Sequence, residues 1–207
     1  MNRIALMLLA CGLLIVGSCA NKQPNGTASN DVAVTLSETE ANADGKKLTE
    51  AYQNKDWETV VSIGDTLIGE KDTMNLAVLY SEALAATGNP QKALSVLDKK
   101  LKSAPDDYYL YQTMGNVYYM MERYDSAIIN YEKVISLKPT YARPYINEGE
   151  ICEILGDKPR AIANYLAAMR LFAANNFYQE TLEFANRVLS LDPTNEEANE
   201  LVGKARQ

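Results

Sequence analysis

The sequence repeats itself with a period of 34 residues, and this period constrains the fold more than any other feature. The segment 108–141 carries small residues at Gly115 and Ala127, aromatic residues around them, and a proline at Pro139. Shifting by one period in either direction finds the same pattern, less complete, in 142–175 and 74–107. Small residues let two helices cross closely, and a proline ends the second helix. The period therefore predicts stacked helix–turn–helix units that share one core.

The segment 108–141 resembles a tetratricopeptide repeat (TPR), a helix–turn–helix of this length. The residues that carry the resemblance are Tyr111, Met114, Gly115, Tyr118, Tyr124, Ala127, Ile128, Tyr131, Val134, Leu137, Lys138 and Pro139. Other units depart from the pattern: in 142–175 Glu148 stands where leucine is usual, and in 41–73 Gly64 stands where an aromatic residue belongs.

The resemblance implies an all-α fold, a TPR solenoid wound as a right-handed superhelix of about four to five repeats with a C-terminal capping helix. The expected repeats are 41–73, 74–107, 108–141, 142–175 and a degenerate 176–207, within a TPR domain of residues 45–207. The register of the last unit stays open, because 162–195 also fits a repeat that reuses the helix of 161–172.

The N-terminus has the pattern of an export signal. Arg3 precedes an unbroken apolar run of 13 residues, 4–16, which is too short for a membrane-spanning helix and suits a signal-peptide core. The residues Val16-Gly17-Ser18-Cys19 resemble the lipobox of bacterial lipoproteins, in which the cysteine is acylated with fatty acids such as palmitate and becomes the new N-terminus. The alternatives are an ordinary secretory signal and acylation at Cys11, which would leave a shorter apolar core.

The lipobox predicts how the chain is organised around its anchor. Residues 1–18 would be a lipoprotein signal peptide, Cys19 the lipidation site, and 19–44, poor in large apolar residues, a flexible tether. The resemblance places the protein in the bacterial cell envelope, and Ala20 after the cysteine favours the outer membrane, facing the periplasm. Cys152, inside an apolar helical pattern, is predicted to be a buried thiol.

Composition excludes several classes of function. The chain has no histidine, which rules out Ser-His-Asp and Cys-His nucleophile systems and histidine-ligated zinc. Its formal net charge of −7 argues against binding to nucleic acid. No phosphate loop, CxxC or calcium loop appears. We therefore expect a protein that is not an enzyme and needs neither cofactor nor metal.

In the TPR family, fixed places on the first helix of each repeat face a concave groove. The residues of this sequence at those places that we select as partner-binding are Tyr109, Gln112, Asn116, Tyr119, Met120, Arg143, Asn147 and Glu150. Amides offer both donors and acceptors to a peptide main chain, and exposed aromatic residues mark interfaces. The simpler interpretation is that these polar residues are only solvated. Tyr131, by contrast, is predicted to point between the helices.

The resemblance implies a non-enzymatic scaffold that binds protein or peptide partners in the envelope. The family's clamp for C-terminal carboxylates is not expected, because Gln112 replaces its lysine. The alternative is a metal- or small-ligand-binding receptor or enzyme that uses acidic groove residues, with a divalent metal held by Glu150 and Glu153.

Overall fold

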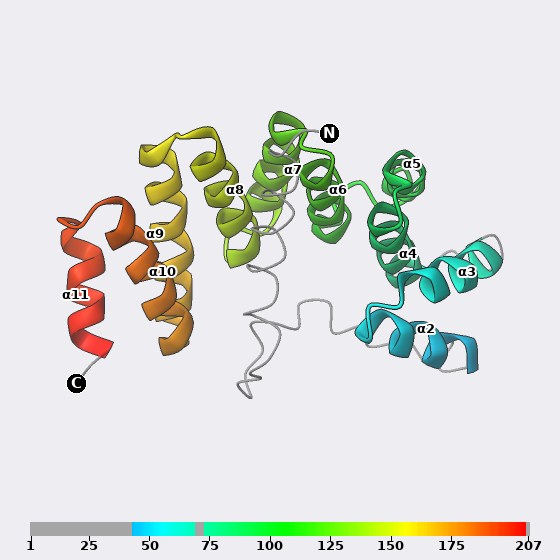
Figure 1. The fold of residues 1–207 in the computed structure, drawn as a ribbon, viewed down its shortest axis with the longest axis horizontal. Coiled ribbons are helices and arrows are strands. Elements are labelled where there is room, and N and C mark those ends of the chain that lie inside the picture. Colours follow the sequence, from blue (N-terminus) through cyan, green and yellow to red (C-terminus); the bar gives the residue numbers. More distant parts are fainter. Residues whose placement is uncertain (1–42, 69–72, 206–207) are drawn as a thin grey trace, which may run out of the picture. The chain divides into compact units, whose positions relative to one another are not determined.

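The computed structural model describes residues 43–68 and 73–205, which form ten helices and no strand (Figure 1). All of them belong to one unit, residues 38–207. The helices are α2 (Ala43–Gln53), α3 (Trp57–Leu67), α4 (Met74–Ala86), α5 (Pro90–Leu101), α6 (Tyr108–Met120), α7 (Tyr124–Leu137), α8 (Ala142–Leu155), α9 (Lys158–Ala174), α10 (Tyr178–Leu191) and α11 (Glu196–Ala205). Each packs against its neighbours in chain order, as the predicted helix–turn–helix solenoid requires.

The predicted signal peptide, Cys19 and most of the tether lie outside the described residues. Helix α2 begins at Ala43, so the last residues of the predicted tether 19–44 are helical. None of the helices in 43–68 and 73–205 is long and apolar enough to cross a membrane.

Short side chains and glycines set the helix ends. The Asp107 carboxylate accepts a hydrogen bond from the backbone N–H of Tyr109 at 2.8 Å, which caps the start of α6. Asp157 caps α9 in the same way through the N–H of Arg160. Helix α8 ends at Leu155 and is capped by Gly156, whose φ of 78° lies in the left-handed region that favours glycine.

At each of three helix crossings, a glycine on one helix faces a tyrosine on the next. Gly115 of α6 faces the ring of Tyr131 of α7, and a methyl group added at Gly115 would lie closer than 3.0 Å to that ring. Gly149 of α8 and Tyr165 of α9 repeat the contact, with the added carbon 2.6 Å from the ring. The missing side chain on one helix therefore makes room for the aromatic ring on the next.

The third crossing differs from the sequence prediction. Gly64 was expected to mark a degenerate position that lacks its aromatic residue. Instead it faces the ring of Tyr80 on α4, so α3 and α4 cross as α6 and α7 do. The aromatic residue is present, but it comes from the following helix.

Two helices are shared between neighbours. Helix α4 packs against α3, α5 and α6, and it is buried on most of its surface. Helix α9 packs against both α8 and α10: Tyr165 meets Gly149, while Phe172 stacks on Phe184 of α10 at 5.6 Å. Helix α9 therefore takes part in the helix pair of 142–175 and in that of 162–195, and the register of the last unit stays open.

Glu148, the departure from leucine in the fourth repeat, is buried at 4% exposure. Its carboxylate forms an ion pair with Arg160 of α9 at 2.6 Å, and Arg160 also reaches Glu132 of α7 at 2.9 Å. The buried charge is tolerated because it has this partner. Cys152, one turn along α8, is a buried free thiol as predicted, and burial raises its pKa.

Candidate functional site

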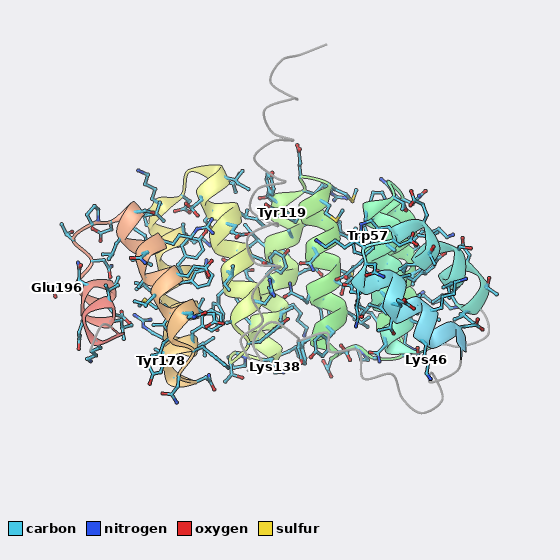
Figure 2. All side chains as sticks on the ribbon, turned by 60° about the horizontal axis from the view of Figure 1, so that its bottom comes forward. Lys46, Trp57, Tyr119, Lys138, Tyr178 and Glu196 are labelled. Carbon is cyan, nitrogen blue, oxygen red and sulfur yellow. The ribbon has the colours of Figure 1, made fainter. Side chains whose placement is uncertain are left out.

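A pocket of about 140 Å³ opens between α6 and α8. It is lined by Asn116, Tyr119, Met120, Tyr131, Asn147 and Glu150. Except for Tyr131, which comes from α7, these residues belong to the first helices of two successive repeats. Tyr119 and Lys138, both labelled in Figure 2, lie at opposite ends of the α6–α7 pair, and the pocket is at the Tyr119 end.

Asn116 is the centre of the hydrogen bonds beside this pocket. Its Oδ1 accepts bonds from Gln112 Nε2 at 3.0 Å, the Tyr131 hydroxyl at 3.0 Å and Asn147 Nδ2 at 3.2 Å. The Tyr131 ring is 1% exposed, yet its hydroxyl reaches this group. The glycine–tyrosine crossing thus ties the core to the polar surface above it.

The polar contacts continue towards the N-terminus through Glu82 of α4. Its carboxylate accepts hydrogen bonds from the Tyr52 hydroxyl and from the Asn116 side chain, and it feels the charge of Arg143. Burial outweighs these favourable interactions and raises the pKa of Glu82. We call the surface defined by Glu82, Asn116, Asn147 and Glu150 the first-helix face, because its residues come from α4, α6 and α8.

On the C-terminal side, Arg187 of α10 closes over two acidic residues of α8. Its Nη2 lies 2.7 Å from Glu153 Oε2, whereas its Nη1 is 3.4 Å from Glu150 Oε1. The guanidinium also lies 4.8 Å from the centre of the Tyr165 ring, and the Tyr165 hydroxyl donates to Glu153. Glu153 therefore has the closer partners, and burial raises the pKa of Glu150 despite Arg187.

The structure brings together five of the eight residues selected from the sequence: Asn116, Tyr119, Met120, Asn147 and Glu150 all line the pocket. Met120 is 53% exposed. Tyr119 is only half-buried, and its ring packs against the core cluster that contains Tyr131 and against Tyr124.

The other three selected residues lie elsewhere. Tyr109, near the start of α6, packs against Tyr108 with ring centres 4.2 Å apart. The prediction that Gln112 lies at the binding surface is wrong. Its side chain is 5% exposed and lies beneath the first-helix face, and its Oε1 has no hydrogen-bond partner among the described residues. Arg143 is exposed and forms no ion pair with a described residue, although its charge acts on Glu82 and Glu150.

Sequence reasoning missed Arg187 and the second role of Tyr131. Arg187 lies on α10, in the segment whose register was open, so no family position identified it. The one signal was the pair of acidic residues on α8, which called for a nearby positive charge. Tyr131 was expected in the core, and it also forms part of the pocket wall through its hydroxyl end.

The contacts of Arg187 argue against the metal alternative. Both carboxylates proposed as ligands, Glu150 and Glu153, face this guanidinium. Within the part of the chain that the structure describes, no group of three or more His, Cys, Asp and Glu residues could hold a metal ion.

Comparison with known proteins agrees with the fold. Residues 108–141 match the family model of the tetratricopeptide repeat. A TPR repeat-containing protein of Treponema pallidum (strain Nichols) is 25% identical over 138 residues, which is 67% of this chain and 17% of that protein. The chain thus spans a small part of that relative.

Solved structures give the same result. A crystal structure of MamA superposes with a TM-score of 0.57 at 19% identity, covering 79% of this chain and 92% of that one. A thermophilic TPR protein of Thermus thermophilus, TTC0263, has a TM-score of 0.53 at 16% identity, covering 79% and 98%. The TPR prediction and the all-helical solenoid are confirmed, and a TPR fold is typical of protein–protein interaction scaffolds.

Proposed function

We propose that this chain is a lipid-anchored, non-enzymatic TPR scaffold that binds protein or peptide partners in the bacterial cell envelope through its first-helix face. The observation that carries the proposal is the pocket between α6 and α8, where five residues selected from the sequence converge around polar groups and the exposed side chain of Met120. Concave sites with few, convergent polar groups are the usual places for ligands.

Site-specific photo-cross-linking tests the binding face. A photoreactive amino acid in place of Met120 should cross-link partners in envelope extracts, because this side chain is 53% exposed at the pocket. The matched control replaces Ile129 of α7, which is 64% exposed and is not among the pocket residues. Equal cross-linking from both positions, or cross-linking from position 129 alone, would show that partners bind elsewhere.

The anchor is supported by the lipobox at residues 16–19 and by the tether that follows it. We propose that the Cys19 thiol carries the lipid and that the protein sits on the outer membrane, facing the periplasm. Cys19→Ser should abolish labelling by a radioactive fatty acid and leave an unprocessed precursor. Cys152→Ser is the matched control and should keep full labelling, and Cys11→Ser tests the other candidate. Fractionation of inner and outer membranes checks the location.

A further inference from the structure

We propose that the pocket between α6 and α8 receives a lysine or arginine side chain of the bound partner. The inference rests on the proposed function and names the chemistry that its binding face selects. It comes from three observations: acceptors without donors, an apolar wall for an alkyl stem, and a local excess of acidic charge.

The first observation concerns the hydrogen-bonding groups at the pocket. Asn147 uses its Nδ2 to donate to Asn116 and to the Tyr131 hydroxyl, and its Oδ1 accepts no bond from any side chain in the described segments. The nearest donor to Glu150 is Arg187, at the long distance of 3.4 Å. The pocket thus presents acceptors with unused capacity, which a lysine ammonium or an arginine guanidinium can fill.

The second observation concerns the apolar part of the pocket. Met120 is exposed, and the Tyr119 ring stands beside it on the last turn of α6. The Tyr119 hydroxyl forms no hydrogen bond with the described residues. A basic side chain can lay its methylene groups along Met120 and the Tyr119 ring while its charged end reaches Glu150.

The third observation concerns charge. Arg187 makes its two shortest contacts with Glu153, which leaves Glu150 incompletely paired, and Glu82 has no ion-pair partner in the described chain. Besides Arg187, Arg143 is the positively charged residue that acts on this surface. Its charge lowers the pKa of both Glu82 and Glu150, although it forms no ion pair with either of them in the described structure. An incoming basic group would therefore compete with Arg143, and the net charge of −7 on the whole chain would draw a basic partner towards the protein.

Because a basic group would compete with Arg143, the proposal predicts the direction in which an Arg143 variant changes the affinity. A partner that brings a positive charge should bind more tightly when Arg143 is replaced by glutamine, because a competitor for Glu150 is removed. A partner that brings a carboxylate should bind more weakly, because Arg143 is the exposed cation that would receive it. The direction of the change separates the two chemistries.

The experiment uses the mature chain and four acetylated, amidated peptides of serine and alanine with one central lysine, arginine, norleucine or glutamate. Binding is followed through the side-chain amide signals of Asn147 in nuclear magnetic resonance titrations. The lysine or arginine peptide should shift these signals in a saturable way, and the norleucine and glutamate peptides should not. The proposal would be overturned if the glutamate peptide bound in a saturable way, or if none of the four peptides bound.

Charge-removing variants test which residue contacts the basic side chain of the peptide. Glu150→Gln should weaken binding of the basic peptide by about tenfold, the loss expected for one charge-assisted hydrogen bond. Glu183→Gln, an exposed position on α10 that is not among the pocket residues, makes the same change in net charge and should leave the affinity within about twofold. Arg143→Gln should strengthen binding severalfold. Equal effects of the Glu150 and Glu183 variants would also overturn the proposal.

The outcome can be separated from that of the proposed function. Cross-linking from position 120 together with no binding of the basic peptides leaves the scaffold function intact and removes the basic side chain. Equal cross-linking from positions 120 and 129, or cross-linking from position 129 alone, removes the binding face itself.

Discussion

The crossing of α6 with α7 and the crossing of α4 with α5 stand at the same place in successive repeats, and they are built differently. At the first, Gly115 makes room for the Tyr131 ring, whose hydroxyl emerges beside Asn116. At the second, Ser81 and Leu97 occupy the equivalent positions, and the Ser81 hydroxyl turns to the carbonyl of Ala93 at 3.4 Å. The second crossing is entirely core, whereas the first also delivers a polar group to the surface. The glycine is therefore specific for the tyrosine and is more than a small residue.

The largest test removes the ring. Tyr131→Ala should destabilise the protein by about 3–5 kcal/mol, because a fully buried aromatic side chain leaves a cavity. Leu97→Ala, at the other crossing, should cost about 2–4 kcal/mol. Tyr131→Phe keeps the ring and loses only the contacts of the hydroxyl with Asn116 and Asn147, so it should cost about 1–2 kcal/mol. Urea denaturation gives all three values, and a Tyr131→Ala cost below that of Tyr131→Phe would contradict the packing.

The next test fills the space opposite the ring. Gly115→Ala places a methyl group against Tyr131 and should cost about 2 kcal/mol net, although alanine favours helix. The control is Gly203→Ala in α11, where nothing lies within 4 Å of the added carbon. That variant should gain about 0.5–1 kcal/mol from helix propensity. Thermal unfolding distinguishes the two, and a stabilised Gly115→Ala would show that the helices do not approach closely.

A third test transfers the tyrosine. Leu97→Tyr alone should be destabilising, because its ring would meet the Ser81 side chain as the Tyr131 ring would meet a side chain at position 115. Adding Ser81→Gly should recover about 1 kcal/mol, so the pair is non-additive in a double-mutant cycle. Additive effects would mean that the two positions do not face each other.

The smallest test concerns pH. The pKa of Glu82 is raised in the folded state, so its ionised form weakens folding at neutral pH, and this penalty is lost as pH falls through the raised value towards the ordinary carboxyl pKa. Glu82→Gln keeps an acceptor for Tyr52 and should be more stable than wild type at neutral pH. The difference should shrink on acidification. A difference that grows towards low pH would show that the carboxylate is stabilising when charged.

The repeat 108–141 and its core could be predicted from sequence because each position of the pattern reports one contact between neighbouring helices. Tyr131 was placed correctly for this reason, whereas Cys152 was placed correctly from the apolar helical pattern around it. Gly64 was misread because its aromatic partner, Tyr80, comes from a different repeat frame. Glu148 was visible as a departure, but its partner Arg160 depends on how α8 lies against α9.

For the candidate site, the sequence predicted only the side of each helix on which a residue lies. Family positions indicate which way a side chain points, and five of the selected residues accordingly meet at one pocket. They do not indicate depth, so Gln112 was expected at the surface and lies beneath it. Contacts between distant repeats, such as Arg187 with Glu150 and Glu153, depend on the stacking of whole repeats.

Helix α9 has 17 residues, against 14 in α8 and α10, and both neighbours depend on its aromatic side chains. Releasing α10 exposes Phe172, and releasing α8 exposes Tyr165, so neither can open at low cost while the other stays closed. Repeat proteins usually fray inward from their ends one repeat at a time. Here the frayed segment would stop at α11, and hydrogen–deuterium exchange should give the backbone amides of α8, α9 and α10 one common free energy of opening, as a single cooperative unit.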